Sequence, residues 1–342
     1  MAARPRRGYQ SSINAAFARS LDSWAREPTL RFYPAVKRAL FEQAAQVFLG
    51  VEAGAESARL AKLFDLLIQG AGTPFRVPLP GTKWRRCLDA RRELEGYLRA
   101  ELPRRRAQGR VDLFSRLCDA SDEDTGARLD DEEIVDHMIF IVFAAHDTTA
   151  SGLSSMIDEL SARPELLARV VRSCRELAPE QPEHGLGWGQ LDELKLIDGC
   201  FREALRLNPP VPSLVRRTVR SCELGGHALP PRAPVTVVVR EVHTDPELWP
   251  QPERFDPDRF DAGRQPEAGG CPRHRHAWLS FGAGSHRCIG AELAMQQVKV
   301  MCYQLFRRFE IERCASVPTT WKRVPLPYPV DGLPLRIRAI AP

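Results

Sequence analysis

The sequence predicts a mainly α-helical protein with small β-sheets, an α+β fold. Apolar residues recur at helical spacing through most of the first 210 residues, and a short β-branched run follows only later. A Pro-rich irregular stretch then leads to a glycine-rich loop and a last helical pattern. Because no internal repeat is present, we expect one domain over residues 1–342: helix-rich in 1–210, strands, the irregular stretch and the loop in 211–290, and a last helix and C-terminal hairpin in 291–342.

The helices before residue 130 follow from apolar periodicity. Residues 12–51 carry apolar positions at helical spacing, interrupted near Pro28 and Pro34. Residues 84–102 form another amphipathic run. Pro103 should end it, because proline lacks the N–H that a helix interior uses.

A long central helix should span residues 130–162. Asp130 and Glu133 have the spacing of a capping box, in which each side chain accepts a hydrogen bond from the other residue's backbone N–H. The centre of this helix, residues 138–150, is apolar nearly all round, and such a helix is normally buried.

Shorter elements complete the chain. Pro164 should open one helix at its first turn, and another should run over residues 197–207. The β-branched run 235–239 predicts a strand. The tail, residues 324–340, predicts a hairpin that turns around Asp331-Gly332.

Composition and charge narrow the class of protein. The chain is 43% hydrophobic and 27% charged, as in globular proteins, and its net charge of +5 is spread out, which gives no reason to expect a nucleic-acid partner. Nine scattered cysteines, an odd number, indicate free thiols and a cytoplasmic location. No apolar run is long enough to span a membrane, so we expect no membrane anchor, and we expect a monomer.

The most informative segment is Phe281-Gly-Ala-Gly-Ser-His-Arg-Cys-Ile-Gly290. A lone cysteine is usually a small buried hydrophobe. Here Gly284 and Gly290 flank Cys288, and the absence of a Cβ lets the backbone approach a flat cofactor closely. A helical pattern begins just after Cys288 and places partial positive charge near its sulfur. A thiolate in such a loop is suited to bind haem iron.

This segment resembles the haem-binding signature of the cytochrome P450 family, Phe-x-x-Gly-x-Arg/His-x-Cys-x-Gly, at every specified position. The resemblance implies haem b (iron protoporphyrin IX) as the cofactor and Cys288 as the axial ligand of its iron. The other haem-binding residues that it implies are Phe281, Gly282, Gly284, His286 and Gly290 in the loop, Arg216, and Ala144 and Ala145 on the central helix.

Polar residues interrupt the apolar centre of the long helix at Asp147 and Thr148. Taken alone, they would indicate a kink or a hydroxyl bonded to the preceding turn. Together with Cys288 they resemble the oxygen-activation motif of the same family, in which the acid relays protons and the hydroxyl orients oxygen. The family usually has glycine where this chain has Ala145, which should narrow the groove that receives oxygen.

Glu203 and Arg206 stand three residues apart on a predicted helix, a spacing that is common in exposed ion pairs. Downstream lies Pro252-Glu-Arg-Phe255. These segments resemble the Glu-x-x-Arg helix of the P450 family and its Pro-Glu-Arg-Phe element. The resemblance implies that Glu203, Arg206 and Arg254 form a buried, structural charge triad.

Two basic residues resemble the family positions that bind the haem propionates. Arg216 precedes the predicted strand, although neighbouring Arg217 leaves the choice open by one residue, and His286 lies in the cysteine loop. A solvated basic patch is the alternative interpretation.

The resemblance begins near residue 12 and implies a P450 fold that lacks its N-terminal strands and first helices. It implies a haem-thiolate monooxygenase that inserts one oxygen atom from O2 into a small lipophilic substrate: a sterol, terpenoid, retinoid or fatty acid. Electrons would come from NAD(P)H through a separate ferredoxin-type or reductase donor. Two alternatives stay open: a truncated, catalytically impaired haem-binding remnant of the family, and a helical binding module without haem.

Overall fold

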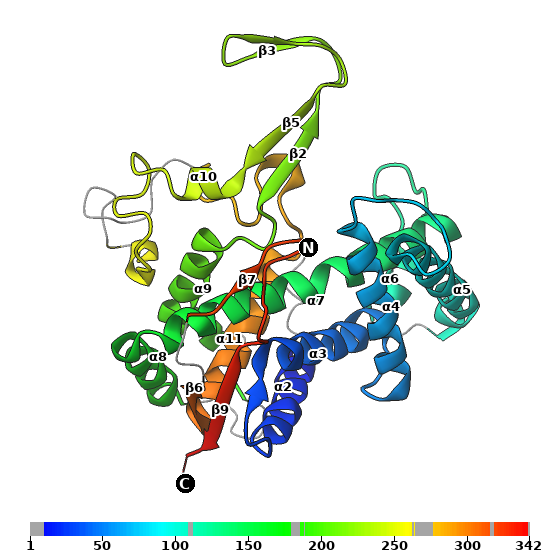
Figure 1. The fold of residues 1–342 in the computed structure, drawn as a ribbon. Coiled ribbons are helices and arrows are strands. Elements are labelled where there is room, and N and C mark those ends of the chain that lie inside the picture. The colour runs from blue at the N-terminus through cyan, green and yellow to red at the C-terminus, as the bar shows by residue number, and fades with distance from the viewer. Residues whose placement is uncertain are drawn as a thin grey trace.

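The computed structural model describes residues 10–108, 112–178, 185–187, 189–261, 263, 276–314 and 318–340. Helices dominate this part of the chain, and short antiparallel strands form four small sheets (Figure 1). No helix among the described residues is long and apolar enough to cross a membrane.

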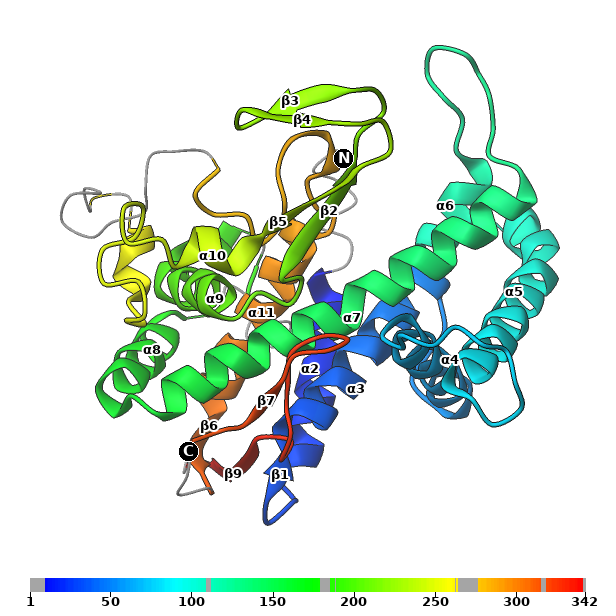
Figure 2. The ribbon, with the colours of Figure 1, turned by 45° about the horizontal axis from the view of Figure 1, so that its top comes forward.

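The long helix α7, Asp131–Ser161, crosses the whole molecule (Figure 2). Its start is the predicted capping box: the Glu133 N–H donates to Asp130 Oδ1 at 2.8 Å, and the Asp130 N–H donates to Glu133 Oε2 at 2.9 Å. The helix is buried all round over residues 149–157. Within 138–150, where the sequence predicts burial, Phe140 is 66% exposed and residues 141, 143–145 and 148 are half-buried.

Helices α4, α5 and α6 gather near one end of α7, and α8 lies near the other (Figure 2). The helices that precede α7 are α2, Gln10–Trp24; α3, Phe32–Ala44, extended by a π-helical turn, Ala45–Leu49; α4, Ala55–Ala71; α5, Lys83–Gln108; and α6, Leu113–Asp119. Those that follow it are α8, Pro164–Glu176; α9, Lys195–Leu207; α10, Val239–His243; and α11, Ala291–Arg308.

The prediction that Pro103 ends its helix is wrong, because α5 continues to Gln108. The segment beyond the proline is held by a buried ion pair. Arg105 donates to Asp112 at 2.7 Å and to the Leu49 carbonyl at 2.6 Å. These contacts offset the backbone hydrogen bond that proline cannot make.

Two apolar clusters share α7. One contains the second half of α7 with α2, α8, α9 and α11, and the other contains its first half with α4, α5 and α6. Leu293 of α11 packs against both clusters. The central helix therefore belongs to one continuous interior and orients the elements on either side of it.

All strand pairs are antiparallel. The three-stranded sheet has the order β1-β9-β6, with β1, Leu30–Arg31; β9, Pro334–Ala339; and β6, Phe309–Arg313. The three pairs are β2, Ser213–Arg217, with β5, Pro234–Val238; β3, Cys222–Leu224, with β4, His227–Leu229; and β7, Trp321–Lys322, with β8, Tyr328–Pro329.

The C-terminal hairpin turns at a different place from the predicted one. Strands β7 and β8 form it, so its turn lies in residues 323–327, whereas Asp331-Gly332 carries the chain from β8 into β9. Gly332 has φ +79°, and a Cβ there would lie 3.3 Å from the Arg31 side chain. The turn instead supplies hydrogen-bond acceptors to the N-terminus of α3. The N–H groups of Phe32 and Tyr33 donate to the Leu333 and Gly332 carbonyls, respectively, each at 3.0 Å.

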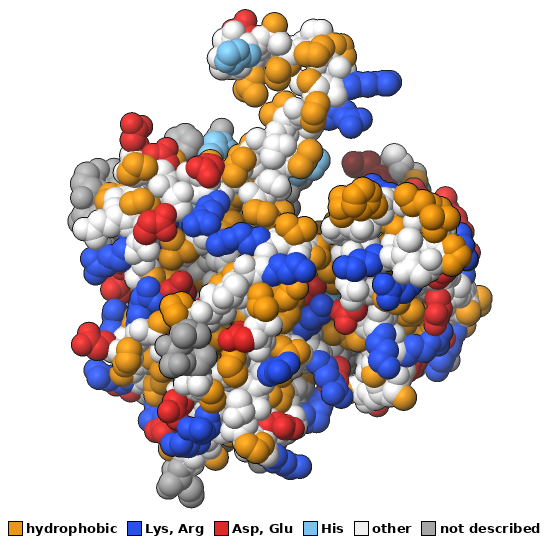
Figure 3. Space-filling model, in the orientation of Figure 1, with side chains coloured by type: hydrophobic (Ala, Val, Ile, Leu, Met, Phe, Trp, Pro, Cys, Tyr) orange, Lys and Arg blue, Asp and Glu red, His pale blue; other side chains and the backbone are white. Residues whose placement is uncertain are grey.

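Strands β2 and β5 form a ribbon that projects from the body and carries β3 and β4 at its tip (Figure 1). Hydrophobic side chains lie exposed on this ribbon (Figure 3), with Val215 at 63% and Val219 at 94% exposure. The ribbon packs little of its surface against the helices.

Candidate functional site

The cysteine loop folds back on itself immediately before α11. The Cys288 N–H donates to the Phe281 carbonyl at 2.8 Å. Gly282 and Gly284 have φ +69° and +65°, left-handed values that glycine adopts without strain. A Cβ at Gly282 would lie 3.3 Å from the His286 carbonyl oxygen. The glycines of this segment are thus required by the turn that presents Cys288.

The thiol of Cys288 is exposed, in a run of six exposed residues from 284 to 289. Ile289, next to it, is 80% exposed. Gly290 then leads into α11, which packs against α7. In Figure 1, α11 runs behind α7, so the loop stands at the start of a helix that crosses the central one.

Residues 278–280 lead into the cysteine loop, and three hydrogen bonds that they donate hold this segment in place. Trp278 Nε1 donates to the Arg202 carbonyl at 3.3 Å, Ser280 Oγ to the Leu205 carbonyl at 3.1 Å, and the Leu279 N–H to His243 Nε2 at 2.8 Å. Both carbonyl acceptors lie in the last two turns of α9, and the Leu205 carbonyl is one of the last four of the helix, which have no intrahelical partner.

His243 connects the same helix to the same segment. Since its Nε2 accepts from Leu279, its Nδ1 carries the proton and donates to the Arg206 carbonyl at 3.0 Å. The imidazole is fully buried, and burial lowers the pKa of His243 to about 4. The ring is a fixed, neutral bridge between α9 and the cysteine loop.

A buried charge cluster underlies this bridge. Arg206 donates to both oxygens of Glu203, at 2.7 and 2.8 Å, and to the His243 carbonyl at 2.7 Å. Arg259 Nε lies 3.2 Å from Glu203 Oε1, which also accepts from the Asp256 N–H at 3.0 Å. The bidentate pairing and the added bonds compensate the charges for their loss of water.

The expectation that Arg254 is the third member of the triad is corrected by the structure. Its guanidinium is exposed and donates to Gln251 at 3.2 Å, and only its backbone carbonyl accepts from Arg206. Arg259 occupies the buried position instead. The signal was a second Pro-x-Arg-Phe pattern, Pro257-Asp-Arg-Phe260, five residues downstream. The 3-10 turn Pro257–Phe260 directs Arg259 inward.

One stripe of α7 remains uncovered next to its buried face. Phe140, Ala144 and Thr148 recur every four residues, so they lie on one side of the helix, where Phe140 is 66% exposed and the other two are half-buried. Thr148 Oγ1 donates to the Ala144 carbonyl at 2.9 Å. Ala145, the residue after Ala144, packs against the apolar cluster that the first half of α7 forms with α4, α5 and α6.

Asp147 points away from that stripe toward α3. The carboxylate is buried, and it accepts from the Tyr33 hydroxyl at 3.0 Å and from Lys37 Nζ at 3.1 Å. Burial raises the pKa of Tyr33, and the Asp147 charge adds to that shift. Sequence reasoning did not identify Tyr33 and Lys37, because their spacing of one turn on α3 does not reveal which helix they face.

His286 and Arg216 both lie at the surface. His286 sits in the short turn Gly284–His286, and the guanidinium of Arg216, on β2, donates to the Val215 carbonyl at 2.9 Å. Ile289, next to Cys288, and Phe140, on the uncovered stripe of α7, are exposed apolar side chains. A reachable thiol, a turn with no side chains at Gly282 and Gly284, and an uncovered apolar stripe suit a flat, largely apolar cofactor such as haem.

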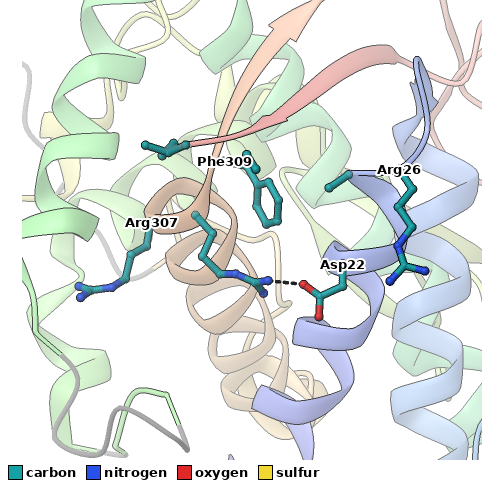
Figure 4. A pocket seen from close by; sticks show the side chains of 8 residues that line it. Asp22, Arg26, Arg307 and Phe309 are labelled. Atoms are coloured by element: carbon teal, nitrogen blue, oxygen red, sulfur yellow. Dashed lines mark hydrogen bonds and ion pairs between the residues drawn. The ribbon is translucent and has the colours of Figure 1, made fainter. Parts of the chain in front are cut away.

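A surface pocket of about 530 Å³ lies elsewhere, between the end of α11, the end of α2 and β9. Asp22 there pairs with Arg308, and Arg26, Arg307 and Phe309 surround them (Figure 4). At 1.5 Å per residue, the 18-residue helix α11 separates this pocket from the cysteine loop by about 27 Å. The pocket is therefore distinct from the site around Cys288.

Comparison with known proteins matches this chain to one family. The family model described as Cytochrome P450 matches residues 21–324. A putative cytochrome P450 136 of Mycobacterium tuberculosis is 33% identical over 337 residues, 97% of this chain and 67% of that protein. An abscisic acid 8'-hydroxylase of Solanum lycopersicum is 30% identical, over 93% of this chain and 65% of that protein.

A solved structure shares the fold. The retinoic acid-bound cyanobacterial CYP120A1 superposes with a TM-score of 0.89 at 27% identity, over 99% of this chain and 76% of that one. This chain spans about two thirds of the length of the curated relatives named above. The mainly helical fold with small sheets that the sequence predicts is thereby confirmed, and the protein is an oxidoreductase that belongs to the cytochrome P450 family.

Proposed function

We propose that this chain is a haem-thiolate monooxygenase that binds haem b through Cys288 and inserts one oxygen atom from O2 into a lipophilic small molecule. The observation that carries the proposal is the exposed Cys288 thiol on a glycine turn, at the start of the helix that packs across α7. When bound, haem would supply the oxidative chemistry.

The chain's own residues would bind, orient and supply protons. Phe281, half-buried against Trp278, and the turn glycines would seat the cofactor, and His286 and Arg216 would reach its propionates. Thr148, on the uncovered stripe, would orient oxygen, and Asp147 would deliver protons. Thr149, the residue after Thr148, also donates from its hydroxyl to the carbonyl four residues earlier, but its side chain is buried. Of the two threonines, Thr148 is therefore the one that faces the open side of α7.

The relatives support a lipophilic substrate. One is named for abscisic acid, another, from Vitis vinifera, for beta-amyrin, and the cyanobacterial structure holds retinoic acid. Among the classes considered, a terpenoid or retinoid therefore has the most support. We place the protein in the cytoplasm, since the eight cysteines of the described chain are all free thiols, and we assign electron supply to NAD(P)H through a separate donor.

The carbon monoxide spectrum of the reduced, haem-loaded protein tests the ligand. Wild type should show a red-shifted Soret band, Cys288→Ser should abolish it, and Cys222→Ser should retain it, because Cys222 is an exposed thiol on the remote strand β3. No shifted band in wild type would rule out thiolate ligation.

Turnover with a reductase, NAD(P)H and isotopically labelled O2 then tests the activity. Incorporation of one labelled oxygen atom into a terpenoid or retinoid supports the monooxygenase. A normal spectrum without any incorporation would identify a haem-binding remnant instead.

A further inference from the structure

The turn of the β7–β8 hairpin, residues 323–327, lies against the central helix. At its start, Arg323 Nη1 donates to the side-chain oxygen of Asn208, the residue that follows α9, at 2.9 Å. At its end, Ser151 Oγ of α7 donates to the Pro327 carbonyl at 2.6 Å. The turn is therefore tied both to α7 and to the end of α9.

These contacts place the turn at one end of the uncovered stripe of α7. Ser151 lies three residues after Thr148, on the same side of the helix. Pro325 reaches the end of α4, where a Cβ on Gly72 would lie 2.6 Å from its own. From Thr148 the stripe continues away from the turn to Phe140, over about 12 Å at 1.5 Å per residue.

The guanidinium of Arg323 has donors to spare. Its Nη1 is used by Asn208, whereas within the described chain Nε and Nη2 donate to no other protein group. Nε–H and Nη2–H form one edge of the guanidinium fork, and such an edge matches the two oxygens of a carboxylate. Because the Arg323 side chain is exposed, a ligand can reach this edge.

A second cation, Arg240 of α10, lies near the first. Burial lowers the pKa of the Arg323 guanidinium, and the nearby charge of Arg240 lowers it further. Among the residues that the structure describes, neither arginine forms an ion pair with a carboxylate. Basic side chains gather where the ribbon meets the body (Figure 3). Two neighbouring cations without a counter-charge favour an anionic ligand.

The surroundings of the two arginines are apolar. Val324, the residue after Arg323, is exposed, and so is Val211, three residues after Asn208. Together with the uncovered stripe, these side chains suit the hydrocarbon part of a ligand. The region therefore combines a cationic end with an apolar bed.

We propose that Arg323 binds the carboxylate of a lipophilic carboxylic acid, with Arg240 adding positive charge, while the apolar body of the acid lies along the uncovered stripe of α7. The inference rests on the proposed monooxygenase function and adds the end group of its substrate. Arg323 is then a specificity-determining residue, because a neutral end group would not pair with its charge.

The test compares two ligands that differ only in this end group. Retinoic acid, a lipophilic carboxylic acid, and its methyl ester are bound to the haem-loaded protein, and both dissociation constants are measured by equilibrium dialysis. Wild type should bind the acid at least about tenfold more tightly than the ester, because only the acid makes a charge-assisted, bidentate pair.

Variants then assign this preference to Arg323. Arg323→Gln should weaken binding of the acid at least about tenfold and leave that of the ester within about twofold. Arg323→Lys keeps the charge without the fork and should restore only part of the preference. Arg240→Gln should weaken binding of the acid about threefold.

The matched control is Lys322→Gln. It removes the same charge one residue away, where the ammonium lies over the Tyr328 ring at 5.9 Å from its centroid, and it should change both affinities by less than about twofold. Equal weakening of acid binding in Arg323→Gln and Lys322→Gln would reduce the effect to general charge and contradict the site. A wild type that binds both ligands equally, or binds neither, overturns it.

The outcome is separable from the proposed function. An acid preference that depends on Arg323, without a red-shifted carbon monoxide band, would support the carboxylate site and contradict the monooxygenase. A normal band and incorporation of labelled oxygen without an acid preference would contradict the carboxylate site alone.

Discussion

The protonation state of His243 is tied to folding. Both ring nitrogens are used, one as donor to the Arg206 carbonyl and one as acceptor from the Leu279 N–H. A second ring proton would remove the acceptor and place a charge in a buried site. The neutral ring is therefore required to hold the segment that precedes Cys288.

This requirement predicts acid sensitivity. The folded-state pKa of His243, about 4, lies below its ordinary value of 6.5, so the unfolded chain binds a proton that the folded one does not. The contribution of His243 is complete above pH 6.5 and is lost as the pH falls toward 4, by up to about 3 kcal/mol. Urea unfolding at several pH values measures it. His243→Gln should flatten the loss over this window, and an unchanged slope would contradict the assignment.

Single residues were predictable where the sequence motif is local. Cys288 and its glycines form a continuous loop, and Glu203 and Arg206 share one helical turn, so spacing alone relates them. Arg259, Tyr33 and Lys37 meet their partners only through packing, at separations of 56, 114 and 110 residues. No spacing rule in one sequence states which of several arginines or lysines turns inward.

Among the elements, α9 and the irregular stretch after α10 are joined by a buried charge cluster. Glu203 and Arg206 on α9 and Arg259 in the 3-10 turn are all buried. Removing one partner of such a cluster leaves an uncompensated charge in the interior.

Arg259→Ala should therefore lower the free energy of unfolding by about 3–5 kcal/mol. Arg254→Ala removes an exposed guanidinium of the same type five residues away, and it should change stability by no more than about 0.5 kcal/mol. Denaturant unfolding of the two variants compares them directly. Equal losses would mean that both arginines support the cluster.

Element boundaries followed the sequence where capping was local and departed from it where tertiary contacts intervened. The capping box of Asp130 and Glu133 begins α7 where the sequence predicts. Pro103 does not end α5, because Arg105 is anchored beyond it. Asp331-Gly332 does not close a hairpin, because it leads into β9 and the Gly332 and Leu333 carbonyls accept from the first N–H groups of α3. Both predictions used only neighbouring residues, whereas contacts with residues distant in the sequence determine where these elements end.

Across the whole molecule, stability should be distributed unevenly around α7. The buried second half of this helix lies in the apolar cluster that it forms with α2, α8, α9 and α11. The β2–β5 ribbon is a two-stranded projection whose side chains are half-buried or exposed, and such ribbons are marginally stable by themselves.

Native-state hydrogen exchange should reveal this contrast. Amides at residues 150–157 of α7 should open only with global unfolding, whereas those of β2 and β5 should exchange at least about a hundredfold faster by local opening. Mass spectrometry of peptides from both regions measures it. Equal protection would mean that the ribbon is stabilised by the body of the protein.

The anchoring of the cysteine loop has a consequence for biosynthesis. Residues 278–280 are held by partners 36 to 76 positions earlier, and the loop continues directly into α11, which packs on α2, α8 and α9. The cysteine loop and the whole of α11 can therefore dock together on these earlier partners only after the ribosome has released the chain through residue 308. Capture of haem would be among the last steps of maturation, and a nascent chain arrested before α11 should emerge without it.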